Sequence, residues 1–166
     1  MSRYFEDLVE GAIVELGSHV FTRAEIIDFA KKYDPQAFHL DEEAAARSLF
    51  GALSASGWHT AAIWLRLLVD ERNRQGELMR FRGERPARYG PSPGFEKLRW
   101  IKPVLVDDTI RFTTRVIEKR DSRTRPEVGL VLFQNEGINH KDELVFTLVS
   151  KIFVERRHPS GAVAAR

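Results

Sequence analysis

The feature of the sequence that most constrains the fold is residues 56–76, which read SGWHTAAIWLRLLVDERNRQG. The spacing of the apolar side chains predicts a helix, and in its first half these side chains point to nearly all sides. Only from Asp70 onward does the segment become polar. A chain of 166 residues is expected to form one domain with one core. We therefore expect one long helix that is buried on most sides because a sheet wraps around it.

Segments that read as strands flank this helix. One is expected before it, over residues 12–21, and four follow it, over residues 95–106, 109–118, 128–138 and 144–155. Short runs of turn-forming residues, at 107–108, 121–126 and 139–142, separate these four strands, so consecutive strands should pair antiparallel. The order predicts an α+β protein with a hot-dog fold, in which an antiparallel β-sheet wraps around a long central α-helix. Because such half-wrapped sheets can pair edge to edge, we also expect a homodimer or a higher homo-oligomer.

Residues 33–43, YDPQAFHLDEE, place a carboxylate and an imidazole between two predicted helices. Thr22 to Glu25 form a capping box, which predicts a helix that begins there. That helix should end near Asp34, because Pro35 disfavours helical dihedral angles at the residue before it. Asp41 is the expected N-cap of a second, short helix. Asp34 and His39 are therefore expected in the loop between the two helices.

Composition and charge exclude several classes of protein. The chain has 26 Lys and Arg against 24 Asp and Glu, a balance too even to indicate a nucleic-acid partner. It has no cysteine, which excludes disulfides, thiolate zinc sites and a cysteine nucleophile. The first residues lack the pattern of a signal peptide, and no apolar run is long enough to span a bilayer. We expect a cytoplasmic protein with one domain over residues 1–157, without membrane partners, and a disordered tail over residues 158–166.

The segment from Phe29 to Thr60 resembles the hydratase motif of the MaoC-like dehydratases, relatives of the (R)-specific enoyl-CoA hydratases. That motif has an Asp, a turn with Asn and Pro, and a His at this spacing, followed by a Gly that opens the central helix. Asp34, His39 and Gly57 match it, and WIKPVLVDDT resembles the strand before the family's V-x-x-G-D-T turn. The resemblance covers residues 12–154. It departs from the usual pattern at four positions: Pro35, Gln36, Ser56 and Asp107.

The resemblance implies a hydro-lyase of acyl-CoA or fatty acid metabolism, which adds or removes water at an enoyl or β-hydroxyacyl thioester without cofactor or metal. It implies that Asp34 acts as the base that orients water, and that His39 completes water activation and proton delivery. The amide of Gly57 lies at the positive end of the expected helix, where it could donate to the thioester carbonyl. Ser56 is expected at the same substrate-binding end.

A basic segment, residues 72–88, has two interpretations. It could be a solvated loop, which composition favours, or an anchor for an anionic handle of the substrate. The segment that ends at Gly94 resembles the family region that meets the pantetheine arm. The resemblance therefore suggests that Arg85, Arg88 and Gly94 bind coenzyme A, although an acyl carrier protein could equally carry the substrate.

Two other functions remain open at this stage. The first is an acyl thioesterase on the same fold, and the second is a non-catalytic subunit that binds acyl-CoA. A metal site is not expected, because the spacing of His39, Asp41, Glu42 and His59 matches no metal-binding motif. His59 is expected to be a core or interface residue rather than a catalytic one.

Overall fold

The computed structural model describes residues 3–122 and 124–159. A short 3₁₀ helix, η1 (Phe5–Asp7), precedes four α-helices and five strands. The helices are α1 (Arg23–Tyr33), α2 (Ala37–Leu40), α3 (Glu42–Ala46) and α4 (Gly57–Phe81). The strands are β1 (Ile13–Val20), β2 (Gly94–Trp100), β3 (Thr109–Asp121), β4 (Val128–Ile138) and β5 (Leu144–Glu155). Residues 160–166 of the predicted tail lie outside the described residues.

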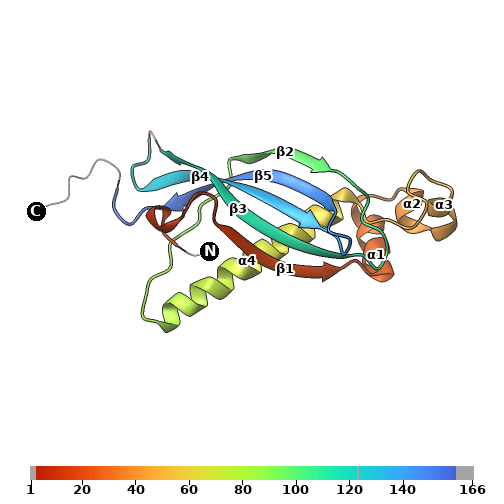
Figure 1. The fold of residues 1–166 in the computed structure, drawn as a ribbon, viewed down its shortest axis with the longest axis horizontal. Coiled ribbons are helices and arrows are strands. Elements are labelled where there is room, and N and C mark those ends of the chain that lie inside the picture. Colours follow the sequence, from red (N-terminus) through yellow and green to blue (C-terminus); the bar gives the residue numbers. More distant parts are fainter. Residues whose placement is uncertain (1–2, 123, 160–166) are drawn as a thin grey trace, which may run out of the picture.

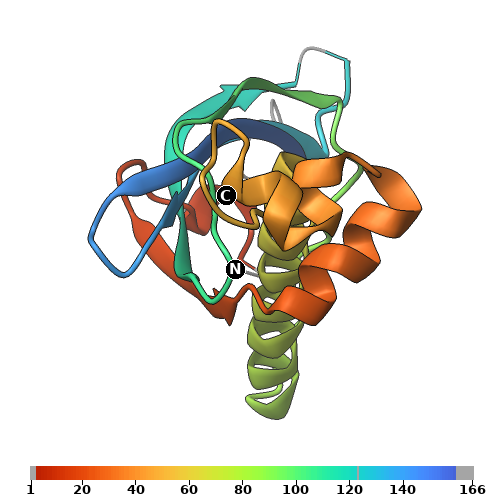
Figure 2. The same ribbon diagram turned by 90° about the vertical axis from the view of Figure 1, so that its right-hand side faces the viewer.

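The five strands form one antiparallel sheet in the order β1-β3-β4-β5-β2, and α4 packs against one of its faces (Figure 1). This arrangement confirms the predicted fold class. The expected pairing of consecutive strands is wrong for β2, which pairs with β5 and not with the next strand along the chain, β3. The helices α1, α2 and α3 gather at one end of the sheet, beside the N-terminal end of α4 (Figures 1 and 2). The opposite, C-terminal end of α4 projects beyond the sheet in both views. The beginning of α4 is therefore the enclosed end of the helix.

The core lies between the sheet and one face of α4. Trp64 and Leu68 supply the helical side of this core. On the sheet side, β3, β4 and β5 contribute buried aromatic residues, among them Phe112, Phe133 and Phe146. Because successive side chains of a strand point to opposite faces, the alternation that predicted these strands also selects the residues that face α4.

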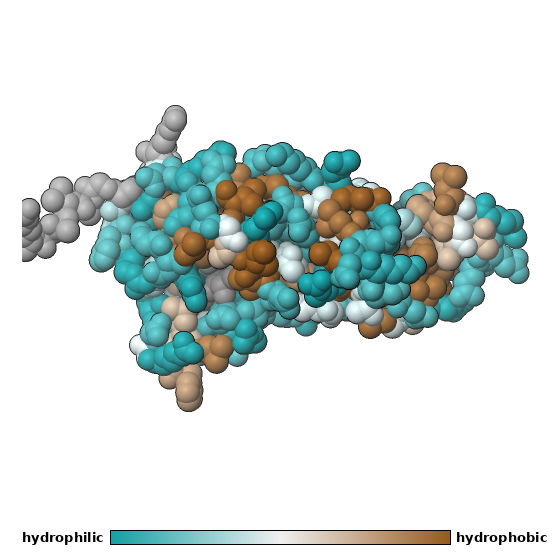
Figure 3. Space-filling model, viewed as in Figure 1, coloured by the Kyte–Doolittle hydropathy of each residue, from teal (hydrophilic) through white to brown (hydrophobic). Residues whose placement is uncertain are grey.

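The prediction that α4 is buried on most sides is wrong for the single chain. Trp58 is 53% exposed, Leu65 50% and Val69 41%. A single five-stranded sheet covers only one side of the helix, so its second apolar side faces outward. Exposed apolar groups also occur elsewhere: Figure 3 shows hydrophobic patches among hydrophilic residues over the sheet, and others at the end that carries α2 and α3. In the described part of the chain, no helix is long and apolar enough to cross a membrane.

Two predicted boundaries also need correction. The interpretation of residues 72–88 as a solvated loop is wrong for residues 72–81, which continue α4. Most of this stretch consists of Arg, Gln, Glu, Leu and Met, which are good helix formers, and the helix continues through Gly76 to Phe81. The strand expected over residues 95–106 ends at Trp100. Pro103 cannot donate a ladder hydrogen bond, and the chain beyond Trp100 leaves the sheet.

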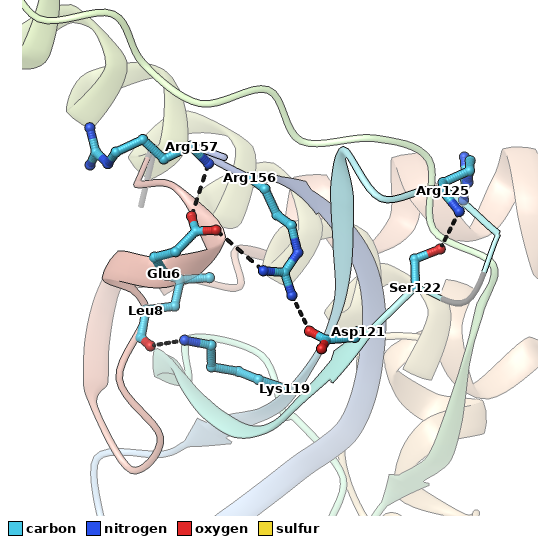
Figure 4. A network of polar contacts seen from close by, with 8 residues as sticks. All are labelled: Glu6, Leu8, Lys119, Asp121, Ser122, Arg125, Arg156 and Arg157. Atoms are coloured by element: carbon cyan, nitrogen blue, oxygen red, sulfur yellow. Dashed lines mark hydrogen bonds and ion pairs between the residues drawn. The ribbon is translucent and has the colours of Figure 1, made fainter. Parts of the chain in front are cut away.

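Polar contacts tie both ends of the described chain to the far end of the sheet (Figure 4). Arg156 pairs with Glu6 of the N-terminal segment and with Asp121 at the end of β3. The backbone N–H of Arg157 donates to Glu6 at 2.9 Å, and the Nζ of Lys119 donates to the carbonyl of Leu8 at 2.7 Å. These contacts hold η1 against the sheet, at the end remote from α1, α2 and α3.

Candidate active site

Asp34 and His39 lie close together between α1 and α3. Asp34 is the C-cap of α1, and its Oδ2 lies 3.4 Å from the Nε2 of His39. The helix ends there as predicted from Pro35. The expectation that both residues lie in a loop is wrong for His39, which belongs to the one-turn helix α2. That extra turn brings the imidazole back toward the carboxylate.

The imidazole of His39 is buried and held at both nitrogens. Its Nδ1 lies 2.7 Å from the backbone carbonyl of Ser54. A carbonyl oxygen can only accept, so Nδ1 must carry a proton, and only Nε2 can exchange protons with a bound molecule. Phe38 and Phe50 pack against the ring, with centroids 4.5 and 6.3 Å from it. The ring is thus oriented with Nε2 toward Asp34.

The carboxylate of Asp34 is held by two residues that depart from the usual family pattern. Gln36 Nε2 donates to Oδ1 of Asp34 at 2.7 Å, and the hydroxyl of Ser56 also donates to this carboxylate. Partial burial raises the pKa of Asp34, but these hydrogen bonds and the nearby His39 outweigh it, so the pKa lies below its ordinary value. Asp34 is therefore ionised at neutral pH.

Ser56 and Gly57 form the N-terminal end of α4. Ser56 is the N-cap, and its Oγ accepts a hydrogen bond from the N–H of Trp58 at 3.2 Å. The same hydroxyl can therefore accept from the helix and donate to Asp34. Gly57 is the first residue of the helix, so its N–H has no acceptor within α4. Ser56 thus links the carboxylate to the helix end where Gly57 presents its amide.

A glycine is required at position 57 by the indole of Trp100. A Cβ placed on Gly57 would lie 2.5 Å from Nε1 of Trp100, and similarly close to neighbouring ring atoms. No Cβ tolerates such a contact, so any larger residue would displace the ring. The absence of a side chain at Gly57 therefore serves the packing of Trp100.

These residues share one cavity of about 490 Å³. Asp34, His39, Ser56 and Gly57 all line it, together with aromatic and aliphatic side chains from α2, α4 and the segment after β2. A water molecule or a substrate atom in this cavity can meet a carboxylate, an imidazole nitrogen and a helix N-terminal amide at once. Such a set can move protons and stabilise a developing oxyanion.

The three residues expected to bind coenzyme A lie elsewhere in the chain. Arg85 forms an ion pair with Glu155 at 2.8 Å, and Arg88 donates its backbone N–H to the same carboxylate. Both line a cleft beside the C-terminal half of α4, and Gly94 opens β2. That cleft includes Arg72, which lies about 22 Å from Gly57 along the helix axis. One chain does not bring these three residues into the cavity of Asp34 and His39.

His59 does not line this cavity. It is buried, its ring stacks on Phe29 with centroids 4.6 Å apart, and Phe21 packs against it edge to face. Burial lowers the pKa of His59 to about 4, so the ring is neutral at physiological pH. Within residues 3–122 and 124–159, no group of three or more His, Asp or Glu side chains is placed to hold a metal ion.

Sequence reasoning missed several residues of the cavity. Trp58 was read only as an apolar residue of the long helix and Trp100 only as part of a strand, yet both line the cavity. Gln36 was noted as a departure from the motif, but its contact with Asp34 was not foreseen. Trp100 is remote from the motif in sequence, so no local pattern could have identified it.

Comparison with known proteins identifies the family. The family model described as MaoC like domain matches residues 12–132. The MaoC-like dehydratase of Rhodospirillum rubrum is 36% identical, with a TM-score of 0.78, over 94% of this chain and 99% of that one. The uncharacterized protein YdeM of Bacillus subtilis (strain 168) is 25% identical over 151 residues, 91% of this chain and 98% of YdeM. R-hydratase PhaJ1 from Pseudomonas aeruginosa, at 20% identity, shares the fold with a TM-score of 0.67 over 92% of this chain and 86% of PhaJ1.

The match of the family model spans most of the chain and includes Asp34, His39 and all of α4. These are the elements that build the cavity described above. The predicted resemblance is thereby confirmed, and the chain belongs to the MaoC-like dehydratase family, which is related to the (R)-hydratases.

Proposed function

We propose that this protein is a hydro-lyase that adds water to an enoyl thioester and, in reverse, removes it from a β-hydroxyacyl thioester. The observation that carries the proposal is the 3.4 Å approach of Asp34 Oδ2 and His39 Nε2 in a cavity lined by Gly57. Membership in the MaoC-like dehydratase family supports the same reaction class.

In the hydration direction, Asp34 accepts a proton from water as the water oxygen attacks the β-carbon. The electrons of the double bond move toward the thioester carbonyl, whose oxygen accepts a hydrogen bond from the N–H of Gly57. Protonated His39 then delivers the proton on Nε2 to the α-carbon. Asp34 ends protonated and His39 neutral, and the proton crosses the short gap between them to restore the pair. No proton is gained or lost beyond those of water.

Features of His39, Asp34 and Gly57 each support one part of this mechanism. Because Nδ1 donates to the carbonyl of Ser54, the catalytic proton travels through Nε2 alone. The lowered pKa of Asp34 keeps the carboxylate ionised, which a base requires. The position of the Gly57 amide at a helix N-terminus suits a carbonyl that gains negative charge. Loss of one such donor typically costs about 3 to 4 kcal/mol in the transition state.

Hydration of crotonyl-CoA, followed by loss of the enoyl absorbance, tests the proposal. Asp34→Asn and His39→Ala should each lower kcat at least about a thousandfold, since each removes a proton-transfer group. Phe81→Ala, an exposed aromatic at the end of α4 outside the cavity, is the matched control and should keep full activity. Circular dichroism checks that the variants fold.

The same assay separates the other two functions. Release of free thiol from crotonyl-CoA or butyryl-CoA, without hydration, would identify a thioesterase. Tight binding of acyl-CoA with neither reaction would identify a non-catalytic subunit. Normal hydration by either site variant would refute the roles given to Asp34 and His39.

We further propose that the protein acts in the cytoplasm as a homodimer, with coenzyme A or an acyl carrier protein as the carrier of its substrate. The outer edge of β2 pairs with no other strand among the described residues, and the apolar side of α4 lies exposed beside it. Unpaired strand edges and exposed apolar surface are both features that association covers. The coenzyme A contacts of Arg85, Arg88 and Gly94 stay predictions.

A further inference from the structure

Two short segments outside the five strands pair beside the catalytic cavity. Ser54 and Leu105 form an isolated antiparallel bridge between them. Two backbone hydrogen bonds, of 2.8 and 2.9 Å, flank this bridge and join the residue pairs Ala55 and Val104, and Val106 and Leu53. In such an antiparallel pair, the N–H and carbonyl groups of the two central residues point away from each other. The backbone groups of Ser54 and Leu105 therefore meet other partners, on opposite sides of the bridge.

Each central residue of the bridge contacts one functional or charged side chain. The carbonyl of Ser54 accepts a hydrogen bond from Nδ1 of His39 at 2.7 Å. On the other side, the N–H of Leu105 donates to Oδ2 of Asp108 at 2.8 Å. The carbonyl of Leu105 accepts from the N–H of Asp108 at 3.1 Å. A continuous series of hydrogen bonds and backbone pairing thus connects Asp108, through the bridge, to the catalytic imidazole.

The side chain of Asp108 is itself fixed in the turn of residues 105–108. It is only 13% exposed, and its second oxygen, Oδ1, lies 3.4 Å from Nδ1 of the exposed His140. The carbonyl of Asp108 accepts from the N–H of Phe21 at 2.9 Å, so the turn is also tied to the chain after β1. Without the carboxylate, the partly buried N–H of Leu105 would lose its acceptor. The loss of a partner for a buried donor is costly, so the turn and the bridge should then rearrange.

The position of the Ser54 carbonyl decides which nitrogen of neutral His39 carries the proton. The hydroxyl of the same serine lies 3.4 Å from Nδ1. A hydroxyl can donate, so it can stabilise the other tautomer, in which Nδ1 is an acceptor and the proton is on Nε2. The carbonyl can only accept, and at 2.7 Å it selects the tautomer with the proton on Nδ1. Only in that tautomer can Nε2 take up the proton from Asp34 that the proposed mechanism requires.

We propose that Asp108 is a positioning residue for this reaction. By holding Leu105, it keeps the carbonyl of Ser54 on Nδ1 of His39 and so fixes the tautomer that catalysis uses. This inference rests on the proposed function, because it takes Nε2 of His39 as the atom that moves the proton. Asp108 does not line the catalytic cavity, so it acts through the backbone alone.

Asp108→Ala tests this role in the full chain. The variant lacks the acceptor for the N–H of Leu105, so neutral His39 should become a mixture of both tautomers, whereas the unaltered protein should have the proton on Nδ1 alone. Nitrogen-15 NMR of the ring measures this without substrate, since protonated and bare ring nitrogens resonate far apart. The kcat for hydration of crotonyl-CoA should fall at least about tenfold, similar to the effect of removing groups that orient metal-binding histidines.

Three further variants separate the acceptor from the other properties of the turn. Asp108→Asn keeps an oxygen that can accept from Leu105 but lacks the charge, so it should retain the Nδ1 tautomer and most of kcat. Asp107→Gly changes the neighbouring residue, whose φ of +67° suits glycine, and leaves Asp108 in place. His140→Gln leaves the bond from Leu105 to Oδ2 in place. Both of these controls should match the unaltered protein in tautomer and in kcat.

The NMR spectrum of Asp108→Ala would overturn the inference if His39 kept its proton on Nδ1 alone. Equal effects of Asp108→Ala and Asp108→Asn would also overturn it, because the charge would then matter and not the acceptor. Should the alanine variant not fold, a mixed tautomer in Asp108→Asn, or a proton on Nε2 of neutral His39 in the unaltered protein, would be equally decisive against it. Failure of the proposed function looks different. The expected change of tautomer in a protein that hydrates no enoyl thioester would support the hold on His39 and sink the hydro-lyase assignment.

Discussion

At the scale of single residues, the site depends on how other side chains hold Asp34. Gln36 and Ser56 are departures from the usual family motif, and both donate to its carboxylate. Ser56 also caps α4, so one hydroxyl positions the carboxylate of Asp34 relative to the Gly57 amide. The departures thus contact the carboxylate and leave both it and the imidazole in place.

Replacement of Ser56 tests this positioning role. Ser56→Ala removes a hydrogen bond that lowers the pKa of Asp34, so that pKa should rise toward its ordinary value. The acid limb of the pH profile of kcat/KM should move to higher pH. Loss of the N-cap should also cost about 1 kcal/mol in the free energy of unfolding. Ser56→Thr, which keeps a hydroxyl, should restore the profile, and an unmoved acid limb in Ser56→Ala would contradict the role.

His59 predicts a pH dependence of stability. Its pKa is about 4 in the folded protein and about 6.5 when unfolded, so between these values the unfolded chain binds more protons. Stability should therefore fall as the pH drops from about 6.5 to 4, by about 2 to 3 kcal/mol. His59→Phe, which retains a ring against Phe29, should flatten this slope in urea denaturation. Replacement of the exposed His140 by Gln is the control, and an unchanged slope in His59→Phe would refute the assignment.

At the scale of elements, the packing of β2 on the start of α4 builds the cavity. Trp100 is the last residue of β2, and its ring occupies the space that a side chain at Gly57 would need. The helix and the strand can approach this closely only because position 57 has no Cβ. The glycine and the tryptophan therefore act as a pair that joins two elements far apart in sequence.

Gly57→Ala tests the coupling of this pair. The added methyl group should displace Trp100 and lower the free energy of unfolding by about 1 to 3 kcal/mol, although alanine favours a helix. In the Trp100→Ala background the same change should be neutral or stabilising. A double-mutant cycle by urea denaturation measures the difference. Additive effects would show that the ring and position 57 are independent.

At the scale of the whole molecule, the single chain leaves an apolar side of α4 and a strand edge exposed. Both lie near β2, the last strand of the sheet, because Trp58 and Leu65 of α4 line a cavity together with Phe95 and Leu98 of β2. In a dimer with its two-fold axis beside β2, the same surface of the partner chain would cover the apolar side of α4 and the edge of β2. Isologous contacts join like surfaces in this way. The expectation that α4 is enclosed could then hold for the assembly rather than for one chain.

Light scattering tests this assembly. We expect a mass of twice the 19.1 kDa of the chain. Val69→Glu places a charge on the exposed apolar side of α4 and should shift the mass toward that of the monomer, because an unpaired charge in an interface is costly. Leu78→Glu, exposed near the C-terminal end of α4, serves as the comparison. A monomeric mass for the unaltered protein at micromolar concentration would end the proposal.

The sequence by itself determined the elements and the motif. The capping box at Thr22, the break at Pro35 and the alternation in β3, β4 and β5 are local signals, and the helices and strands follow them. The match of Asp34 and His39 to the family motif likewise implied that both side chains act on the same water molecule. Such features depend on dihedral preferences and on side-chain periodicity, which act over a few residues.

Only the tertiary structure decided what surrounds that pair. Trp100 lies 43 positions after Gly57 in the sequence and still packs on it, because the sheet brings the end of β2 to the start of α4. The hydrogen bond from His39 to the Ser54 carbonyl and the exposure of one side of α4 are likewise decided by the tertiary structure. Contacts of this kind depend on how elements pack against one another, and no local pattern in the chain records that packing.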